Sequence, residues 1–194
     1  RDHLLDHLEG LTALGQEPHT LARKLVTFKV FLRWLASEKK IPANVTEVMD
    51  GPRLWKLLPG FLTEEEVTRL LAVNARAKDP LTQRNAAIFE LLYASGLRVS
   101  ELCDLRAEEV DLDARLLRVT GKGRKTRIVP FGDPAVVQLA RYLREVRPVL
   151  LRDPGIAFLF LSHRGLRLTR ERIWTLVKQT AIQAGITKDI SPHT

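Results

Sequence analysis

The sequence predicts a mainly α fold in two domains, of which the second is α+β and carries one small antiparallel β-sheet. Apolar residues recur at helical spacing along most of the 194 residues, and two short segments near the middle are rich in strand-forming residues. Breakers gather at Asp50-Gly51-Pro52 and Pro59-Gly60. We therefore expect a helical domain over residues 1–50, a linker over residues 51–61 and a second domain over residues 62–194.

Two apolar stripes predict helices in the first domain. The stripes are Leu4, Leu5, Leu8 and Leu11, then Leu21, Leu25, Phe28, Leu32 and Leu35. Thr20 precedes the second stripe and is the expected N-cap of that helix. Arg23, Lys29 and Arg33 lie largely away from the stripe and give the helix a basic face.

Helix boundary signals recur in the second domain. Thr63 and Glu66 form a capping-box pattern, and the next helix runs from about Thr82 to a left-handed C-cap at Gly96. A short helix then begins around Arg98.

Two strands are expected at Leu116 to Val119 and Arg127 to Val129, joined by a Gly121-Lys122-Gly123 hairpin tip. Asp133-Pro134 is expected to supply the N-cap and first residue of a helix that reaches Leu150.

The last third contains three further signals. Phe158 to Leu161 suggests an edge strand, and Thr169 is expected to cap a helix that stops at Gly185. Ser191-Pro192 suggests the start of one more helix.

The charge balance favours a polyanionic partner. Lys and Arg number 31 against 23 Asp and Glu, which gives a net charge of +8, and each cation placed on a nucleic-acid phosphate releases a condensed counterion. Charge alone leaves open a basic surface that binds nothing. The single Cys103 excludes an intrachain disulfide and is expected to be a buried structural thiol. No apolar stretch approaches the roughly 20 residues that cross a bilayer, so a cytoplasmic protein away from membranes is expected.

Two cations are suited to phosphoryl chemistry. Arg98 offers a rigid fork of donors that matches phosphate oxygens, and Glu101 lies on the same helix face, where it could hold the guanidinium. An exposed ion pair on a solvated helix explains the same pattern. Lys122, between two glycines, could protonate a leaving alkoxide or only touch a backbone phosphate.

The remaining polar residues near these motifs are less specific. Arg124, Lys125 and Arg127 are interpreted as nonspecific phosphate contacts or solvated charge. His193 means little alone but would add a proton donor to a phosphoryl-transfer site. No histidine cluster or acidic pair has the spacing of a metal site, so we expect neither a metal nor another cofactor.

Three segments together resemble the motifs of tyrosine recombinases. Residues 94–102 (ASGLRVSEL), 121–130 (GKGRKTRIVP) and 191–193 (SPH) match in order and spacing, with particular similarity to the bacterial Xer-type recombinases and related phage integrases. Residues 63–67 and 168–174 also look like segments of this family. The resemblance implies a helical core-binding domain followed by a recombinase catalytic domain.

The resemblance also implies roles for individual residues. Arg98 would be the first catalytic arginine and grip the scissile phosphate, with Glu101 as its acidic support. Lys122 would protonate the leaving 5′ oxygen, and His193 would begin the family's His-x-x-Arg motif.

DNA contacts are implied in both domains. Those of the core-binding domain would be Arg23 and Lys29; those of the catalytic domain would include Thr169, Arg170, Trp174 and Lys178. Core packing is an equally good explanation of Trp174.

The resemblance implies a longer protein that recombines duplex DNA through a 3′-phosphotyrosine, without metal or nucleotide, in a homo- or hetero-tetramer. The second arginine, the nucleophilic tyrosine and the helix that docks on a neighbouring subunit are expected beyond residue 194, and the first helices before residue 1. Tyr93 and Tyr142 do not match the nucleophile, so these 194 residues alone are not expected to cleave DNA. Two alternatives remain: an architectural DNA-binding protein that keeps the fold without its chemistry, and a basic helical domain with no specific DNA target.

Overall fold

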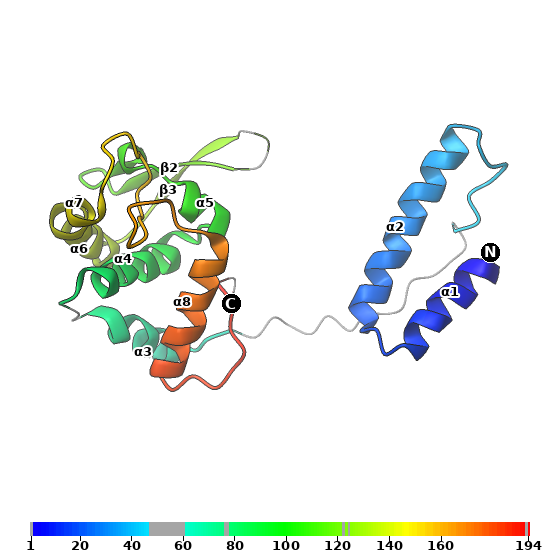
Figure 1. Ribbon diagram of the computed structural model, residues 1–194, viewed down its shortest axis with the longest axis horizontal. Coiled ribbons are helices and arrows are strands. Elements are labelled where there is room, and N and C mark those ends of the chain that lie inside the picture. The colour runs from blue at the N-terminus through cyan, green and yellow to red at the C-terminus, as the bar shows by residue number, and fades with distance from the viewer. Residues whose placement is uncertain (1, 47–60, 76–77, 122, 124, 193) are drawn as a thin grey trace. The chain divides into compact units, whose positions relative to one another are not determined.

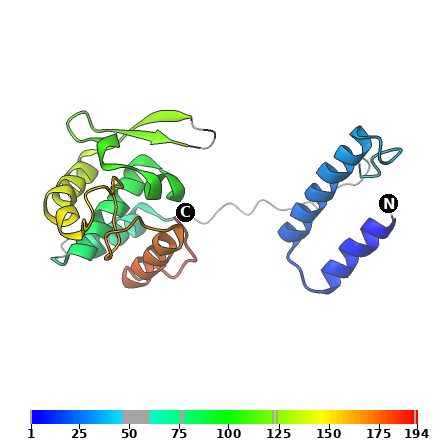
Figure 2. The ribbon, with the colours of Figure 1, turned by 45° about the horizontal axis from the view of Figure 1, so that its top comes forward.

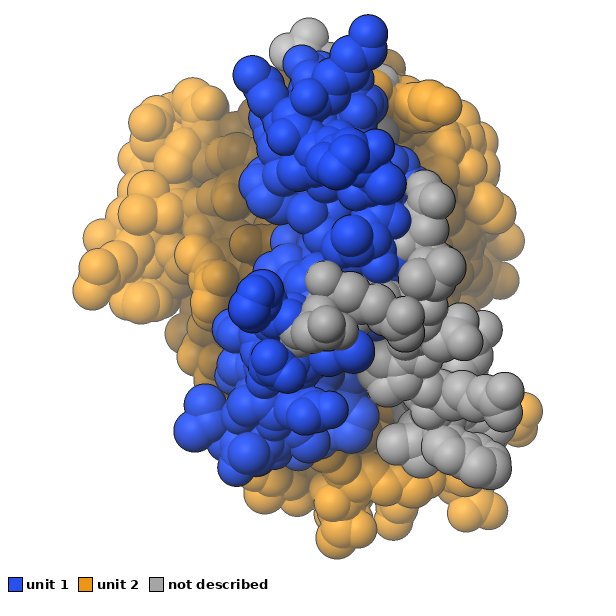
Figure 3. Space-filling view, turned by 90° about the vertical axis from the view of Figure 1, so that its right-hand side faces the viewer, with its two compact units in different colours: residues 1–58 blue, residues 59–194 orange. Residues whose placement is uncertain are grey.

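The computed structural model describes residues 2–46, 61–75, 78–121, 123, 125–192 and 194. The chain forms two compact units, Arg1–Leu58 and Pro59–Thr194, which are distinguished by colour in Figure 3. The predicted linker over residues 51–61 lies almost entirely outside the described residues. None of the described helices is both long and apolar enough to cross a membrane.

Unit 1 contains α1 (Asp2–Ala13) and α2 (Pro18–Ser37), in agreement with the two predicted stripes (Figure 1). Leu25 is buried, and an edge-on ring contact between His7 and Phe28 joins the helices at a centroid distance of 5.9 Å. The predicted N-cap at Thr20 is wrong. Glu17 occupies the cap position and Pro18 follows it, because the fixed φ of proline and its missing N–H suit the first helical turn.

The first helices of unit 2 are α3 (Glu64–Ala75), α4 (Pro80–Ser95) and α5 (Val99–Asp104). The capping box is confirmed: the Thr63 amide donates to Glu66 at 2.8 Å, and the Glu66 amide donates to the Thr63 hydroxyl at 3.3 Å. Helix α4 begins two residues earlier than predicted. Asp79 is its N-cap and accepts from the Thr82 amide at 2.9 Å.

The sheet of unit 2 is antiparallel, in the order β1-β2-β3. The two predicted strands appear as β2 (Leu116–Thr120) and β3 (Thr126–Pro130), and their hairpin lies next to α5 (Figures 1 and 2). The short strand β1 (Val110–Asp111), which follows the 3₁₀ turn η1 (Ala107–Glu109), was not predicted because two residues carry no readable alternation.

The predicted helix up to Leu150 is a continuous helical run with a wider turn inside it. It consists of α6 (Asp133–Arg141), the π-helical turn η3 (Tyr142–Val146) and α7 (Arg147–Leu150). Its N-cap is Gly132 rather than Asp133, so the Asp-Pro pair lies one position further into the helix than predicted.

The expected edge strand over Phe158 to Leu161 is wrong, since only isolated β-bridges occur at its two ends. Its carbonyls bond to side chains of α4 and of the α6–α7 run instead of to a neighbouring strand. The donors are the Arg147 guanidinium to Phe158 at 2.9 Å, the Tyr142 hydroxyl to Leu159 at 2.9 Å and the Arg84 guanidinium to Leu161 at 2.8 Å. These bonds satisfy three carbonyls of the segment without a strand ladder.

The last described helix is α8 (Arg170–Gln183). Thr169 caps it as predicted, accepting from the Arg172 amide at 3.2 Å, and Gly185 follows its end with a φ of 68°. Only Thr194 follows Ser191 and Pro192 among the described residues, so the helix expected to start there stays a prediction. Cys103 is buried as predicted, and burial raises its pKa to about 11, which suits a structural thiol.

Candidate active site

Arg98 lies on the short connection between α4 and α5, where the backbone is fixed from both sides. Gly96 ends α4 in the left-handed conformation, with a φ of 59° and its amide donating to the Leu92 carbonyl at 3.0 Å. Leu97 and Val99 are both buried. The alternation of buried and exposed positions turns Arg98 outward, and 69% of its side chain is exposed.

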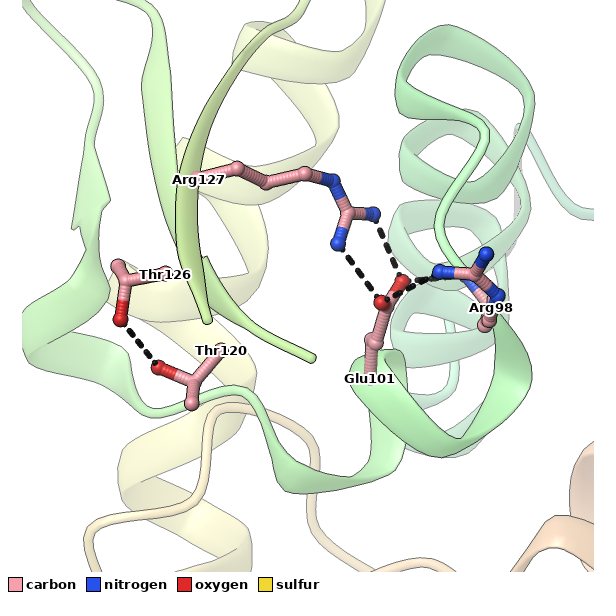
Figure 4. A network of polar contacts seen from close by, with 5 residues as sticks. All are labelled: Arg98, Glu101, Thr120, Thr126 and Arg127. Carbon is pink, nitrogen blue, oxygen red and sulfur yellow. Dashed lines mark hydrogen bonds and ion pairs between the residues drawn. The ribbon is translucent and has the colours of Figure 1, made fainter. Parts of the chain in front are cut away.

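Glu101 holds Arg98 as the sequence predicted, and it also holds Arg127 of β3 (Figure 4). Its Oε1 accepts from Arg98 Nη1 at 3.1 Å and from Arg127 Nη1 at 2.7 Å. Its Oε2 accepts from the Arg98 amide at 2.9 Å and from Arg127 Nη2 at 2.9 Å. The side chain of Glu101 is only 4% exposed, so one buried carboxylate joins α5 to the hairpin.

The two guanidinium groups keep Glu101 ionised. The hydrogen bonds from Arg127, and then those from the Arg98 amide and side chain, lower the pKa of Glu101 to about 2 against the opposing effect of burial. The same carboxylate raises the pKa of Arg127. The three groups therefore carry one net positive charge at neutral pH.

The contact between Arg127 and Glu101 was missed by the sequence interpretation, which grouped Arg127 with nonspecific phosphate contacts. A signal for it exists in the strand pattern. Arg127 is two residues from the half-buried Val129 and pairs across the sheet with the buried Val119, so it belongs to the inward face of β3. A charged side chain on that face requires a partner.

Two surface depressions meet at Arg98. One, of about 480 Å³, is lined by Arg98, Val99, Ser100, Arg170, Glu171 and Trp174. The other, of about 700 Å³, is lined by Arg98, Ser100, Glu101, Asp104, Thr120, Gly121, Lys125, Thr126 and Arg127. Residues from α5, the hairpin and α8 thus share one surface around Arg98.

This arrangement brings together several residues predicted from the sequence. Arg170 and Trp174 lie beside Arg98, whereas Lys125 lies in the second depression. Trp174 is 40% exposed, which favours a surface contact over core packing.

The other predicted DNA contacts are placed differently. Thr169 is exposed and caps α8, and Lys178 forms an ion pair with Asp189 at 3.3 Å outside both depressions. In unit 1, Arg23 is exposed and Lys29 is half-buried. Lys122, Arg124 and His193 lie outside the described residues.

Neither tyrosine resembles an exposed nucleophile of this site. Tyr142 is buried, and burial raises its pKa to about 12; Tyr93 is exposed on α4 but lines neither depression at Arg98. Among the described residues, no group of three or more His, Cys, Asp or Glu side chains is placed to hold a metal ion.

Comparison with known proteins connects this geometry to a family. The family model described as "Phage integrase family" matches residues 60–194. The tyrosine recombinase XerD of Pseudomonas putida is 43% identical over all 194 residues, and XerD of Staphylococcus epidermidis is 38% identical over the same length. The chain spans 65% of the length of each of these relatives.

Solved structures agree with the sequence comparison. A crystal structure of the XerA recombinase, at 26% identity, matches 99% of this chain and 80% of its own with a TM-score of 0.62. The XerH recombinase bound to its difH substrate is only 19% identical but shares the fold, with a TM-score of 0.77 over 99% of this chain and 56% of its own. The chain therefore belongs to the phage integrase family of tyrosine recombinases.

Proposed function

We propose that the full-length protein is a site-specific recombinase that cleaves and rejoins duplex DNA through a 3′-phosphotyrosine intermediate. The observation that carries this proposal is the exposed Arg98 guanidinium, held on a buried carboxylate where two depressions lined with cations meet. An oriented arginine fork is suited to the charge that develops on phosphate oxygens during transfer. The whole-chain similarity to proteins named tyrosine recombinase XerD supports the same reaction.

The chemistry divides between residues of this chain and a nucleophile outside it. Arg98 binds the non-bridging oxygens of the scissile phosphate, and Glu101 fixes its orientation. A tyrosine supplied from beyond this chain attacks phosphorus, and the bond to the 5′ oxygen breaks. Lys122 gives that oxygen a proton and His193 assists proton transfer; these two roles rest on the sequence motifs alone.

Duplex DNA is the proposed partner, and we propose that both units contact it. XerH is a relative whose structure was solved with its difH substrate, which supports DNA as the ligand of the shared fold. The proposed contacts are Arg23, Lys29, Arg124, Lys125, Thr169, Arg170, Trp174 and Lys178, whereas Arg127 is assigned a different role below. We further propose a cytoplasmic protein that acts as a homo- or hetero-tetramer on paired sites, without a metal or another cofactor.

The test is trapping of the covalent intermediate. The full-length protein is first used to select a binding site from a random-sequence DNA library. That site is then prepared with a nick just 3′ of the scissile phosphate, so that cleavage releases a short fragment which diffuses away. A protein–DNA adduct that survives denaturation, with phosphotyrosine identified by mass spectrometry, is the expected result.

Tight, site-specific binding without any adduct would contradict the proposal and favour an architectural DNA-binding protein. Binding of all sequences with equal affinity would favour the basic domain without a specific target.

A further inference from the structure

We propose that Arg127 is a positioning residue for Arg98, acting through the carboxylate that both arginines share, and is not itself a phosphate contact. The inference deepens the proposed function and rests on it, because it concerns how Arg98 is kept available for the scissile phosphate.

The hydrogen-bond geometry gives Arg127 the stronger hold on Glu101. Both terminal nitrogens of Arg127 donate, at 2.7 and 2.9 Å, one to each carboxylate oxygen. The Arg98 guanidinium donates with Nη1 alone, at 3.1 Å. Paired hydrogen bonds between a guanidinium and a carboxylate are the more specific arrangement, so Arg127 determines how the carboxylate is oriented.

Because Arg98 and Arg127 share one carboxylate, a positive charge remains on the more exposed arginine, Arg98. Two guanidinium groups face one buried carboxylate, and Arg98 is the more exposed of the two, at 69% against 41% for Arg127. Without Arg127, Glu101 would be free to turn both oxygens toward Arg98. Arg98 would then be neutralised and its fork occupied, and both effects would weaken its grip on a phosphate.

The hairpin backbone packs against Arg127 and Glu101, so Arg127 is not a simple surface cation. A Cβ atom placed on Gly121 would lie 3.2 Å from Glu101 Oε1 and 3.5 Å from Arg127 Nη1. Beside it, the Gly121 amide donates to the Lys125 carbonyl at 2.9 Å, and the hydroxyls of Thr120 and Thr126 are 3.1 Å apart (Figure 4). The Arg127 guanidinium is thus engaged next to the turn that joins the two hairpin strands.

The test measures single-turnover cleavage by the full-length protein at saturating DNA, together with the Kd for the same site. The variants are Arg127→Gln, Glu101→Gln and the double variant. Arg144→Gln is the matched control, since Arg144 donates to Glu145 at 2.7 Å in an exposed pair outside the site.

Arg127→Gln is expected to slow cleavage about a hundredfold, the order of loss that follows a misplaced catalytic group, while its Kd changes less than about threefold, as for a residue outside the phosphate contacts. The double variant is expected to cleave about tenfold faster than Arg127→Gln, because removing the carboxylate's charge frees Arg98 again. Arg144→Gln should cleave at the wild-type rate.

Three results would overturn the inference. One is a weakened Kd with an unchanged rate at saturation, which would make Arg127 a DNA contact. Another is a double variant no faster than Arg127→Gln, which would make the pair merely structural. The third is a wild-type rate for Arg127→Gln; the proposed function would survive that result, because the protein would still form the covalent adduct.

Arg127→Lys keeps the test decisive if Arg127→Gln does not fold, as judged by thermal unfolding. Lysine retains a charge to share the carboxylate but loses the paired geometry. It should keep cleavage within about tenfold of wild type, as partial retention of an ion pair implies. A loss as large as that of Arg98→Ala would contradict charge sharing.

Discussion

At the scale of single residues, the Glu101 carboxylate accepts four hydrogen bonds from two arginines and is almost completely buried. Such a group is costly to bury unless its charge is compensated, and here compensation comes from separate parts of the chain. Arg98 is three residues away on the same helix turn, whereas Arg127 is 26 residues away on a strand. The contact therefore connects local helix geometry to the hairpin.

The lowered pKa of Glu101 predicts how its contribution to stability depends on pH. The folded value of about 2 lies below the ordinary 4.5, so the stabilisation is fully present above about pH 4.5 and is lost as the pH falls toward 2. A shift of this size corresponds to about 3 kcal/mol. Glu101→Gln should lower the free energy of unfolding by roughly that amount at pH 7 and by much less near pH 2, as measured by urea denaturation.

Arg144→Gln removes an exposed ion pair elsewhere and serves as the control, with little expected change in the free energy of unfolding at either pH. An equal loss of unfolding free energy for Glu101→Gln at pH 7 and near pH 2 would show that the ionised carboxylate is not the source of the stability.

At the scale of secondary-structure elements, the sequence predicted best where a boundary depends on adjacent residues. Thr63 with Glu66, Gly96 and Thr169 all act as their local patterns indicate. The prediction at Thr20 was wrong because a competing local signal, the proline two residues earlier, determines the helix start. These errors move a boundary but leave the element in place.

Elements defined by distant contacts could not be predicted in the same way. The segment from Phe158 to Leu161 has the composition of a strand, yet its carbonyls bond to side chains that are 11 to 77 residues away. The same limit applies to Arg127, whose partner follows only from the register of the folded hairpin.

Gly96 and Gly10 form a matched pair for testing the connection before Arg98. Gly96→Ala should destabilise the protein by about 1 kcal/mol, because Gly96 has a φ of 59° and an alanine there is strained although no atom lies within 4 Å. Gly10→Ala, inside α1 and equally uncrowded, should instead stabilise by about 0.5 kcal/mol. Urea denaturation measures both; a change of the same sign in the two variants would contradict the backbone argument.

Thr169 allows capping to be separated from DNA contact. Thr169→Ala should cost about 1 kcal/mol of stability, because the Arg172 amide loses its acceptor, whereas Thr169→Asn keeps a capping oxygen and should cost less than about 0.5 kcal/mol. If both variants weaken DNA binding while only the alanine variant loses stability, Thr169 contacts DNA directly. If Thr169→Asn instead keeps both the stability and the DNA affinity that Thr169→Ala loses, the effect of Thr169 on DNA binding comes from capping alone.

At the scale of the whole molecule, composition indicated the class of partner before any site was identified. The net charge of +8 favours a polyanion, and the predicted fold class, helical with a small antiparallel sheet, is confirmed. Composition could not show where the charges gather, because that depends on the fold that brings α5, the hairpin and α8 to one surface.

The dependence of DNA affinity on salt tests this charge argument. Binding through many phosphates predicts that the logarithm of the association constant falls with the logarithm of salt concentration by about 0.9 for each phosphate contacted. For the full-length protein we expect a slope steeper than about −4, measured by fluorescence anisotropy with duplex DNA. A slope matching only one or two phosphates would favour the basic domain that has no specific DNA target.

Cleavage and binding by Arg98→Ala in the full-length protein together test the catalytic role of Arg98. If Arg98 grips the scissile phosphate, this variant should form no detectable covalent adduct on the nicked site while keeping its Kd within about tenfold of wild type, since many other phosphates still contribute to affinity. An Arg98→Ala protein that forms the adduct at the wild-type rate would rule out a catalytic role for Arg98.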